Sequence, residues 1–190
     1  TGSTALERFL AENESVLQQH GWEYPRAARR AAGHHDLAFL VSGGYPDWAM
    51  PQPVGLDELI QSLQAEVAAT SANIILSSEN FYLQADPQDV ASMLERIGFS
   101  KSQLSLLVYV RRQDQAHLSW YNQKVKAQGY TGTIAESVQE FDRLWDYAAQ
   151  LEGWASVFGA GQLHVQPYEA AKLPDADVRR SFLSLLELPA

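Results

Sequence analysis

The chain has 190 residues, and its hydrophobic fraction of 46% and aromatic fraction of 11% supply enough apolar side chains for the core of one domain. This composition excludes intrinsic disorder, which requires few apolar residues and a high density of charge. The 14 Lys and Arg residues against 23 Asp and Glu residues give a net charge of −9 at pH 7, so nucleic acid and anionic membranes are not expected as partners. The absence of cysteine excludes disulfides and cysteine-bound zinc and fits a reducing, cytoplasmic location. No apolar run is long enough to span a bilayer, so no membrane span is expected.

The first half of the sequence predicts helices on either side of a long irregular segment. Apolar side chains at helical spacing predict a helix from about Ser3 to His20. The glycines and prolines between positions 22 and 55 predict an irregular segment with one short helix near His35–Leu40, and long loops of this kind are typical of active or substrate sites. A second helical stripe runs from Leu56 to Val67, and the apolar run Asn73–Ser77 predicts a strand buried on both faces.

The second half alternates helices and strands. Asp86-Pro87 is typical of an N-cap followed by the first helical residue, and predicts a helix that ends at Gly98. Strands are predicted at residues 104–110 and 163–165, and further helices at about 113–128, 134–146, 147–158 and 177–186. This alternation predicts an α/β fold, a parallel sheet flanked by helices, in a single domain over residues 1–190.

The chain start is the first candidate binding segment. Thr1, Gly2, Ser3 and Thr4 lead directly into the first predicted helix. Free backbone N–H groups and the positive end of the helix dipole suit a phosphate or sulfate there. The alternative is that these hydroxyl side chains only cap the helix.

The second candidate segment follows the strand at 73–77, because ligands of parallel sheets bind at the carboxyl ends of strands. Glu79 stands at such an end and can act as a general base for an acceptor hydroxyl, unless its segment only forms a turn. His34 and His35 in the irregular segment are further candidate bases, because imidazole titrates near neutral pH. His35-Asp36 is not a metal site on this spacing, since the sequence announces no third ligand.

The third candidate segment ends the strand at 104–110. Arg111 presents a planar fork of donors that suits phosphate oxygens, and Ser119 adds a hydroxyl eight residues later. The alternative of a surface ion pair with Asp114 applies best to Arg112.

These three segments, in this order, resemble the sulfotransferases that use 3′-phosphoadenosine 5′-phosphosulfate (PAPS), and in particular bacterial sulfotransferase-like proteins. In that family a loop Lys-[Thr/Ser]-Gly-[Thr/Ser]-Thr cradles the 5′-phosphosulfate, and residues 1–4 match it except for the Lys. The family's Arg and the Ser eight residues later bind the 3′-phosphate, and Arg111 and Ser119 match that spacing. Further similar stretches are residues 22–26, 34–35, 77–81 and 167–169.

The resemblance implies a P-loop-like sulfotransferase fold with PAPS as co-substrate and no metal. It implies in-line transfer of a sulfuryl group to an acceptor hydroxyl of a carbohydrate or another small molecule. Residues 1–4 would hold the 5′ end of the nucleotide, and Arg111 with Ser119 would hold its 3′-phosphate, so all of them are expected to share one anion pocket. Glu79 is the first choice for the base, before His34 and His35.

The chain departs from the family pattern at two places. The loop Lys and the strand that should precede Thr1 are missing from the sequence, so we expect a chain cut within its phosphosulfate loop or a degenerate homologue. Gln166 stands where bacterial relatives often show Arg. One alternative is therefore a non-catalytic nucleotide-binding or interaction domain. Another is a P-loop kinase, which would require Gly-x-x-x-x-Gly-Lys-[Ser/Thr] and an acidic magnesium ligand.

Overall fold

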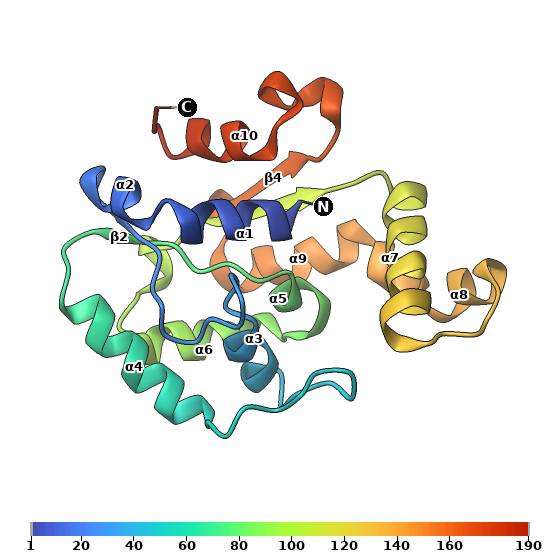
Figure 1. The fold of residues 1–190 in the computed structure, drawn as a ribbon, viewed down its shortest axis with the longest axis horizontal. Helices are drawn as coiled ribbons and strands as arrows, with labels where there is room; N and C mark the ends of the chain where they lie inside the picture. Colours follow the sequence, from blue (N-terminus) through green and yellow to red (C-terminus); the bar gives the residue numbers. More distant parts are fainter. Residues whose placement is uncertain (1, 190) are drawn as a thin grey trace. The chain divides into compact units, whose positions relative to one another are not determined.

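A computed structural model describes residues 2–189, which divide into two compact units (Figure 1). The discontinuous unit comprises Gly2–Leu104 together with residues 177–189, and the inserted unit comprises Ser105–Ala176. The residues of the inserted unit therefore interrupt the sequence of the discontinuous unit. The single domain over residues 1–190 that the sequence predicts stays a prediction.

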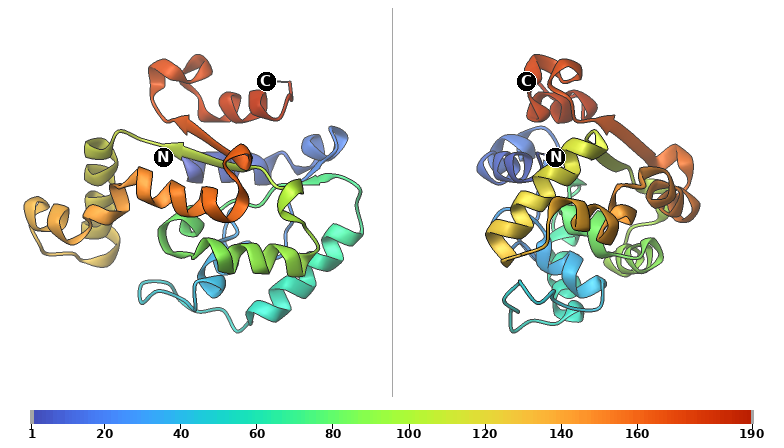
Figure 2. Two further views of the ribbon diagram at one scale, coloured as in Figure 1. Left: turned by 180° about the vertical axis from the view of Figure 1, so that it is seen from behind. Right: turned by 90° about the vertical axis from the view of Figure 1, so that its right-hand side faces the viewer.

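The discontinuous unit is mainly helical. Its helices are α1 (Ser3–Glu12), α2 (Glu14–Gln19), α3 (His35–Val41), α4 (Leu56–Ala68), α5 (Glu79–Gln84), α6 (Pro87–Ile97) and α10 (Val178–Leu185). Its strands β1 (Trp22–Glu23) and β2 (Asn73–Ile74) pair in parallel, with Trp22 opposite Asn73. In Figures 1 and 2, α10 lies beside α1, and α4 lies beside α6.

Helix α6 forms where its capping residues predict it. The Asp86 carboxylate accepts a hydrogen bond of 2.7 Å from the Gln88 N–H, Pro87 is the first helical residue, and Gly98 with φ of +121° ends the helix. The side chains that α6 buries are Val90, Ala91, Met93 and Ile97. This helix confirms the sequence prediction, and it packs against α3 and α4 in the discontinuous unit.

The core of the discontinuous unit is formed by apolar side chains from its helices and its irregular segment. Leu10 on α1, Leu37 on α3, Leu63 on α4 and Tyr24 from the loop are all 0% exposed. The Tyr24 hydroxyl donates a hydrogen bond of 2.7 Å to the Ala32 carbonyl, which satisfies the polar atom that this burial would otherwise leave without a partner. The irregular segment is thus anchored by the core.

Three elements differ from the sequence prediction. The helix expected at about 3–20 is broken at Asn13, whose side chain donates a 2.7 Å hydrogen bond to the Phe9 carbonyl and so ends α1. Helix α5 was not predicted, because its six residues are too few to show a helical repeat. Strand β2 is shorter than expected. The Ser77 carbonyl accepts a 2.7 Å hydrogen bond from the His34 N–H, and this bond does not belong to a strand pairing.

The inserted unit pairs two longer strands. Its elements are β3 (Leu106–Val110), α7 (Gln113–Gln128), α8 (Ile134–Glu140), α9 (Tyr147–Phe158) and β4 (Leu163–Pro167). The two strands are parallel, with Leu106 opposite Leu163 and Val110 opposite Pro167, and the views agree that they lie side by side (Figures 1 and 2). The helices form the crossover that a parallel pair requires.

A buried hydrogen-bond chain holds α8 against α7. The Trp145 indole donates to Nδ1 of His117 at 2.8 Å, so the opposite ring nitrogen carries a proton and donates to the Ser137 hydroxyl at 2.9 Å. That hydroxyl in turn donates to the Ile134 carbonyl at 2.8 Å. Each polar group in the chain has a partner, so His117 is a structural residue of this unit.

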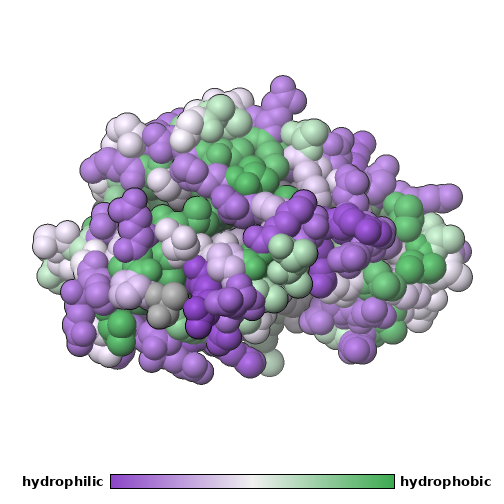
Figure 3. Space-filling model, turned by 90° about the horizontal axis from the view of Figure 1, so that it is seen from above, coloured by the Kyte–Doolittle hydropathy of each residue, from purple (hydrophilic) through white to green (hydrophobic). Residues whose placement is uncertain are grey.

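The α/β class is confirmed, but the expected single parallel sheet is found only in part. The described strands form two separate two-stranded parallel sheets, one in each unit. Over residues 2–189, none of the helices combines the length and the apolar character needed to cross a membrane. On the face drawn in Figure 3, hydrophilic side chains separate several hydrophobic areas from one another.

Candidate functional site

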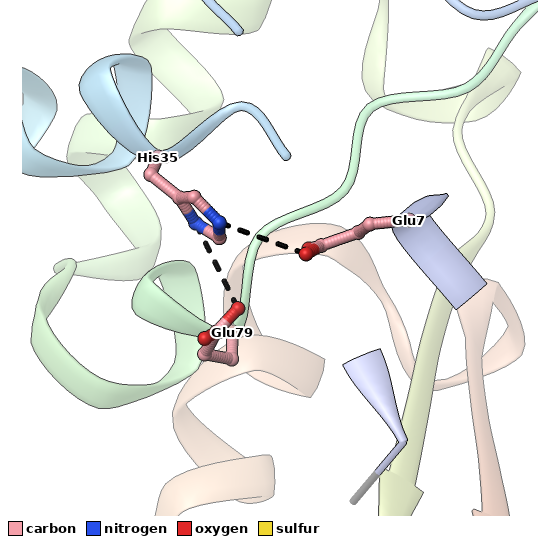
Figure 4. A group of neighbouring side chains, drawn as sticks. All are labelled: Glu7, His35 and Glu79. Carbon is pink, nitrogen blue, oxygen red and sulfur yellow. Dashed lines mark ion pairs between the residues drawn. The ribbon is translucent and has the colours of Figure 1, made fainter. Parts of the chain in front are cut away.

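Glu7, His35 and Glu79 converge in the discontinuous unit (Figure 4). Glu7 comes from α1, while His35 and Glu79 are the first residues of α3 and α5. Nε2 of His35 lies 3.6 Å from Oε2 of Glu7, and Nδ1 lies 3.7 Å from Oε2 of Glu79. We refer to these three residues as the Glu-His-Glu cluster. It unites two of the three candidate bases from the sequence and adds a carboxylate that was not predicted.

His34 holds the start of α3 in place. Its side chain is fully buried, Nδ1 accepts a 3.2 Å hydrogen bond from the Ser77 N–H, and Nε2 lies 3.0 Å from the Pro25 carbonyl, to which it donates. Burial lowers the pKa of His34 to about 4, and the charge of Arg29 acts in the same direction. Both ring nitrogens are therefore engaged in the scaffold, and the ring is neutral near pH 7.

The imidazole of His35 lies among polar groups at the start of α5. Ser78 caps α5 by accepting a 3.2 Å hydrogen bond from the Asn80 N–H, and its Oγ lies 2.8 Å from Nδ1 of His35. The Asn80 amide nitrogen lies 3.2 Å from the same Nδ1. These groups fix the ring so that Nε2 faces Glu7.

Close packing around the cluster requires a glycine at position 33. A Cβ atom on Gly33 would lie 2.7 Å from the carboxyl carbon of Glu7 and 2.7 Å from the His35 ring, closer than such atoms approach one another. The backbone therefore passes directly against two members of the cluster, and a side chain at this position would displace them.

Glu7 is the most buried member of the cluster. Its side chain is 2% exposed, and Oε1 accepts a 3.1 Å hydrogen bond from the Ser77 hydroxyl. Burial raises the pKa of Glu7 to about 7, and the negative charge of Glu79 adds to this effect, whereas the Ser77 hydrogen bond opposes it. This carboxyl group thus gains or loses a proton near neutral pH.

Glu79 connects the cluster with solvent. Its side chain is 39% exposed, although its Oε2 atom is buried and has no hydrogen-bond partner among residues 2–189. The cluster therefore presents an imidazole between two carboxylates, one buried and one accessible. Such a group can accept a proton from a ligand or bind a cation.

The sequence contains one signal for the burial of Glu7. Glu7 lies beside Leu6 and three residues before Leu10 on the buried face of α1, where a charged side chain is rarely found without a partner. A carboxylate within an apolar helical stripe indicates a buried polar interaction. Its partner could not be identified from the sequence alone, because His35 and Ser77 lie far along the chain.

The predicted phosphosulfate loop begins at the limit of the described residues. Thr1 lies outside them. Gly2 precedes α1 in a left-handed conformation with φ of +78°, Ser3 and Thr4 are its first helical residues, and no side chain within residues 2–189 caps this helix. The first turn of α1 therefore has backbone N–H groups without a cap.

Arg111 lies in the inserted unit, directly after β3. It lines a hollow of about 450 Å³ together with Gln115 and Tyr168, and its Cζ lies 5.4 Å from the centre of the Tyr168 ring. Its Nε atom is buried without a hydrogen-bond partner among the described residues. A buried donor without a partner suits an anionic ligand, because an acceptor would then satisfy it.

The neighbouring arginine differs from Arg111. Arg112 pairs with Asp114 at 2.5 Å, which confirms the surface ion pair proposed for it. Ser119 is exposed on α7, one turn beyond Gln115, and does not line the hollow. The sequence predicted an anion pocket shared by Arg111, Ser119 and residues 1–4, and this shared pocket stays a prediction.

A further hollow of about 510 Å³ lies in the discontinuous unit. It is lined by residues 28–31, Asp36, residues 52–54 and Leu59, and it does not include the Glu-His-Glu cluster. The ion pair between Arg30 and Asp36, at 2.7 Å, satisfies charged groups in its wall. We therefore place the candidate chemistry at the cluster, where a buried oxygen lacks a partner, and not at this hollow.

The chain matches none of the protein-family models, curated proteins or solved structures with which it was compared. Its function is therefore argued from the geometry of the residues themselves.

Proposed function

We propose that the protein is a sulfotransferase that moves a sulfuryl group from PAPS to the hydroxyl of a small-molecule or carbohydrate acceptor. The observation that carries this proposal is the approach of His35 to Glu79 at 3.7 Å, because these two candidate bases come from distant segments of the sequence. Independent support comes from Arg111, whose buried Nε atom lacks a partner beside a hollow large enough for part of a nucleotide.

The cluster supplies the proton acceptor for this reaction. Glu79, the accessible carboxylate, receives the hydroxyl proton of the acceptor, directly or through His35. The acceptor oxygen forms a bond to sulfur while the bond from sulfur to the bridging phosphate oxygen breaks. Adenosine 3′,5′-bisphosphate leaves with that electron pair. A positive charge that develops on His35 lies between two carboxylates, which stabilise it.

His34 has a different role in this proposal. Both of its ring nitrogens are used by the Ser77 N–H and the Pro25 carbonyl, so it positions α3 and does not meet an acceptor. We therefore assign the base to Glu79 and His35, with Glu79 still the first choice.

Nucleotide binding is the first experiment. In the full-length protein, including any residues that precede Thr1, saturating adenosine 3′,5′-bisphosphate should raise the melting temperature, because a ligand that binds only the folded state stabilises it. The substitution Arg111→Ala should weaken binding by about 1.5–3 kcal/mol, the contribution of a charge-assisted contact. Arg112→Ala is the matched control, because Arg112 already pairs with Asp114. An unchanged melting temperature at saturating ligand would contradict the nucleotide site.

Turnover is the second experiment. Release of adenosine 3′,5′-bisphosphate from PAPS is followed with panels of monosaccharide, oligosaccharide and phenol acceptors. Glu79→Gln should lower turnover by about 10²-fold or more while nucleotide affinity stays within about twofold, because general-base catalysis contributes on this scale. The control is Glu12→Gln, an exposed glutamate on α1. Equal losses of turnover and affinity would remove the base role, and nucleotide binding without turnover would favour the non-catalytic domain.

A further inference from the structure

We propose that Glu7, His35 and Glu79 bind one first-row divalent transition-metal ion, with Zn²⁺ as the best fit. This inference goes beyond the metal-free reaction proposed above. The sequence lacked a third ligand beside the histidine, and the structure supplies two carboxylates from α1 and α5. One nitrogen and two oxygens form a donor set that such ions commonly take in proteins.

The distances fit a small coordination sphere. One donor atom from each residue lies within 4.8 Å of the other two. Bonds of roughly 2.1 Å place two donors of a tetrahedral ion about 3.4 Å apart. Nε2 of His35 and Oε2 of Glu7 are separated by 3.6 Å, so an ion fits between them with little movement. Oε2 of Glu79 lies 3.7 Å from Nδ1, so the partly exposed Glu79 side chain has to rotate toward Nε2 to form the third bond.

The groups around His35 orient it as a ligand. When Nε2 binds the ion, Nδ1 carries the ring proton and donates a hydrogen bond to the Ser78 hydroxyl oxygen, which lies 2.8 Å away. A second-shell hydrogen bond of this kind fixes the ring tautomer in metal sites. The Ser77 hydroxyl plays the corresponding part for Glu7 through its 3.1 Å hydrogen bond to Oε1.

A separate observation supports a cation at this point. Oε2 of Glu79 is buried and lacks a hydrogen-bond partner among residues 2–189, and the Glu7 carboxylate is 2% exposed. Two carboxylates thus face one imidazole. A cation bound between them would satisfy both oxygens and neutralise their mutual repulsion.

The donor set also predicts selectivity. Mg²⁺ and Ca²⁺ prefer oxygen donors, and Mg²⁺ retains several waters, whereas imidazole favours zinc and its neighbours. We therefore expect Zn²⁺ and Co²⁺ to bind and Mg²⁺ to bind at least 100-fold more weakly.

Metal occupancy would also regulate the proposed reaction, and this part of the inference rests on the proposed function. An ion on His35 and Glu79 occupies the lone pairs that accept the hydroxyl proton. The rate of sulfuryl transfer should therefore fall as the ion occupies the metal site, and it should recover when a chelator removes the ion.

The binding experiment uses the untagged full-length protein after treatment with EDTA and its removal. Co²⁺ is titrated while its visible absorption is followed, and Zn²⁺ affinity is measured by calorimetry. We expect one ion per chain and a tetrahedral Co²⁺ spectrum. His35→Gln and Glu79→Gln should each weaken Zn²⁺ binding at least tenfold, while Glu12→Gln should leave it unchanged. Glu79 is partly exposed, so its variant tests the site even if substitutions at the buried Glu7 prevent folding.

Each outcome separates the two proposals. The metal site is overturned if no ion binds, or if both cluster variants retain the wild-type affinity. Zn²⁺ binding at the cluster without sulfuryl transfer to any acceptor would support the metal site and count against the proposed function. Transfer that is insensitive to bound Zn²⁺ would overturn the regulatory part.

Discussion

His34 and His35 are adjacent in the sequence, yet they lie in different surroundings. His34 is fully buried and donates to the Pro25 carbonyl, whereas the side chain of His35 is 17% exposed and faces two carboxylates. Neighbouring side chains at the start of a helix point in different directions, so only one of the pair can join the core. The other is then presented at the cluster.

The buried His34 should make stability depend on pH. Its pKa is about 4 in the folded protein and about 6.5 in the unfolded chain, so between these values the unfolded chain binds a proton that the folded protein does not. The contribution of His34 to stability is therefore lost as the pH falls through this range, whereas the raised pKa of Glu7 adds stability over the same range. We expect His34 to lower the free energy of unfolding by about 2 kcal/mol between pH 7 and pH 5. Urea denaturation of the wild type and of His34→Gln at both pH values, with EDTA present, separates this contribution from that of Glu7.

Substitution provides the control for this pH effect. His34→Gln removes the titrating group and keeps a side-chain donor, so between pH 7 and pH 5 its free energy of unfolding should rise by about 2 kcal/mol relative to that of the wild type. His20→Gln, at an exposed position, should leave the pH dependence as it was. An identical pH dependence in wild type and His34→Gln would show that other groups cause it.

Gly33 offers a second test at this scale. Gly33→Ala should destabilise the protein by about 1–3 kcal/mol, because the added Cβ would lie 2.7 Å from atoms of Glu7 and His35. Gly161→Ala is the matched control, since a Cβ there meets nothing within 4 Å. Both changes in unfolding free energy are obtained from urea titrations, and equal effects would contradict the close packing at Gly33.

The sequence was sufficient to nominate Glu79 and His35 but not to assemble the cluster. Glu79 was nominated because it follows a predicted strand, and His35 because of its place in a loop rich in glycine and proline. Glu7 was missed because its position on a helical stripe indicates burial without naming a partner. The sequence could not distinguish the roles of His34 and His35. Their roles depend on which of the two rings the start of α3 directs toward the Ser77 N–H.

At the scale of elements, local capping signals were the most reliable part of the sequence. Helix α6 has both of its boundaries at the residues that predict them, Asp86 and Gly98. The first helix was less predictable, since a single side-chain bond from Asn13 divides an otherwise continuous apolar stripe. Short strands were also difficult, because two-residue ladders are selected by tertiary pairing and not by propensity.

The cap of α6 gives a prediction for this scale. Asp86→Ala should lower the free energy of unfolding by about 1 kcal/mol, because the Gln88 N–H then loses its 2.7 Å partner. Glu95→Ala, on the exposed face of the same helix, should change it by less than about 0.5 kcal/mol. Chemical denaturation compares the two variants, and equal losses would show that the Asp86 cap contributes nothing.

At the scale of the whole molecule, the two units differ in how completely they bury their cores. The fully buried side chains Leu10, Leu37 and Leu63 all belong to the discontinuous unit. In the inserted unit, β3 is only half-buried, and Val165 on β4 is 40% exposed. Less apolar surface is therefore removed from water around this strand pair.

This difference predicts unequal local stability. Amides of β3 and β4 should exchange with deuterium at least tenfold faster than those at the centres of α4 and α6, because elements with fewer buried contacts open at lower free energy. Native-state hydrogen exchange read out by NMR measures both sets in one sample. Uniform exchange across both units would instead support the single domain that the sequence predicts.

Helix α10 packs against α1, although the whole inserted unit separates them in the sequence. On the ribosome, α1 emerges before α10, and all residues of the inserted unit are translated between them. The helix that carries Glu7 therefore lacks this contact until the inserted unit has been made. A nascent chain thus has to keep one face of α1 uncovered while another folding unit is synthesised.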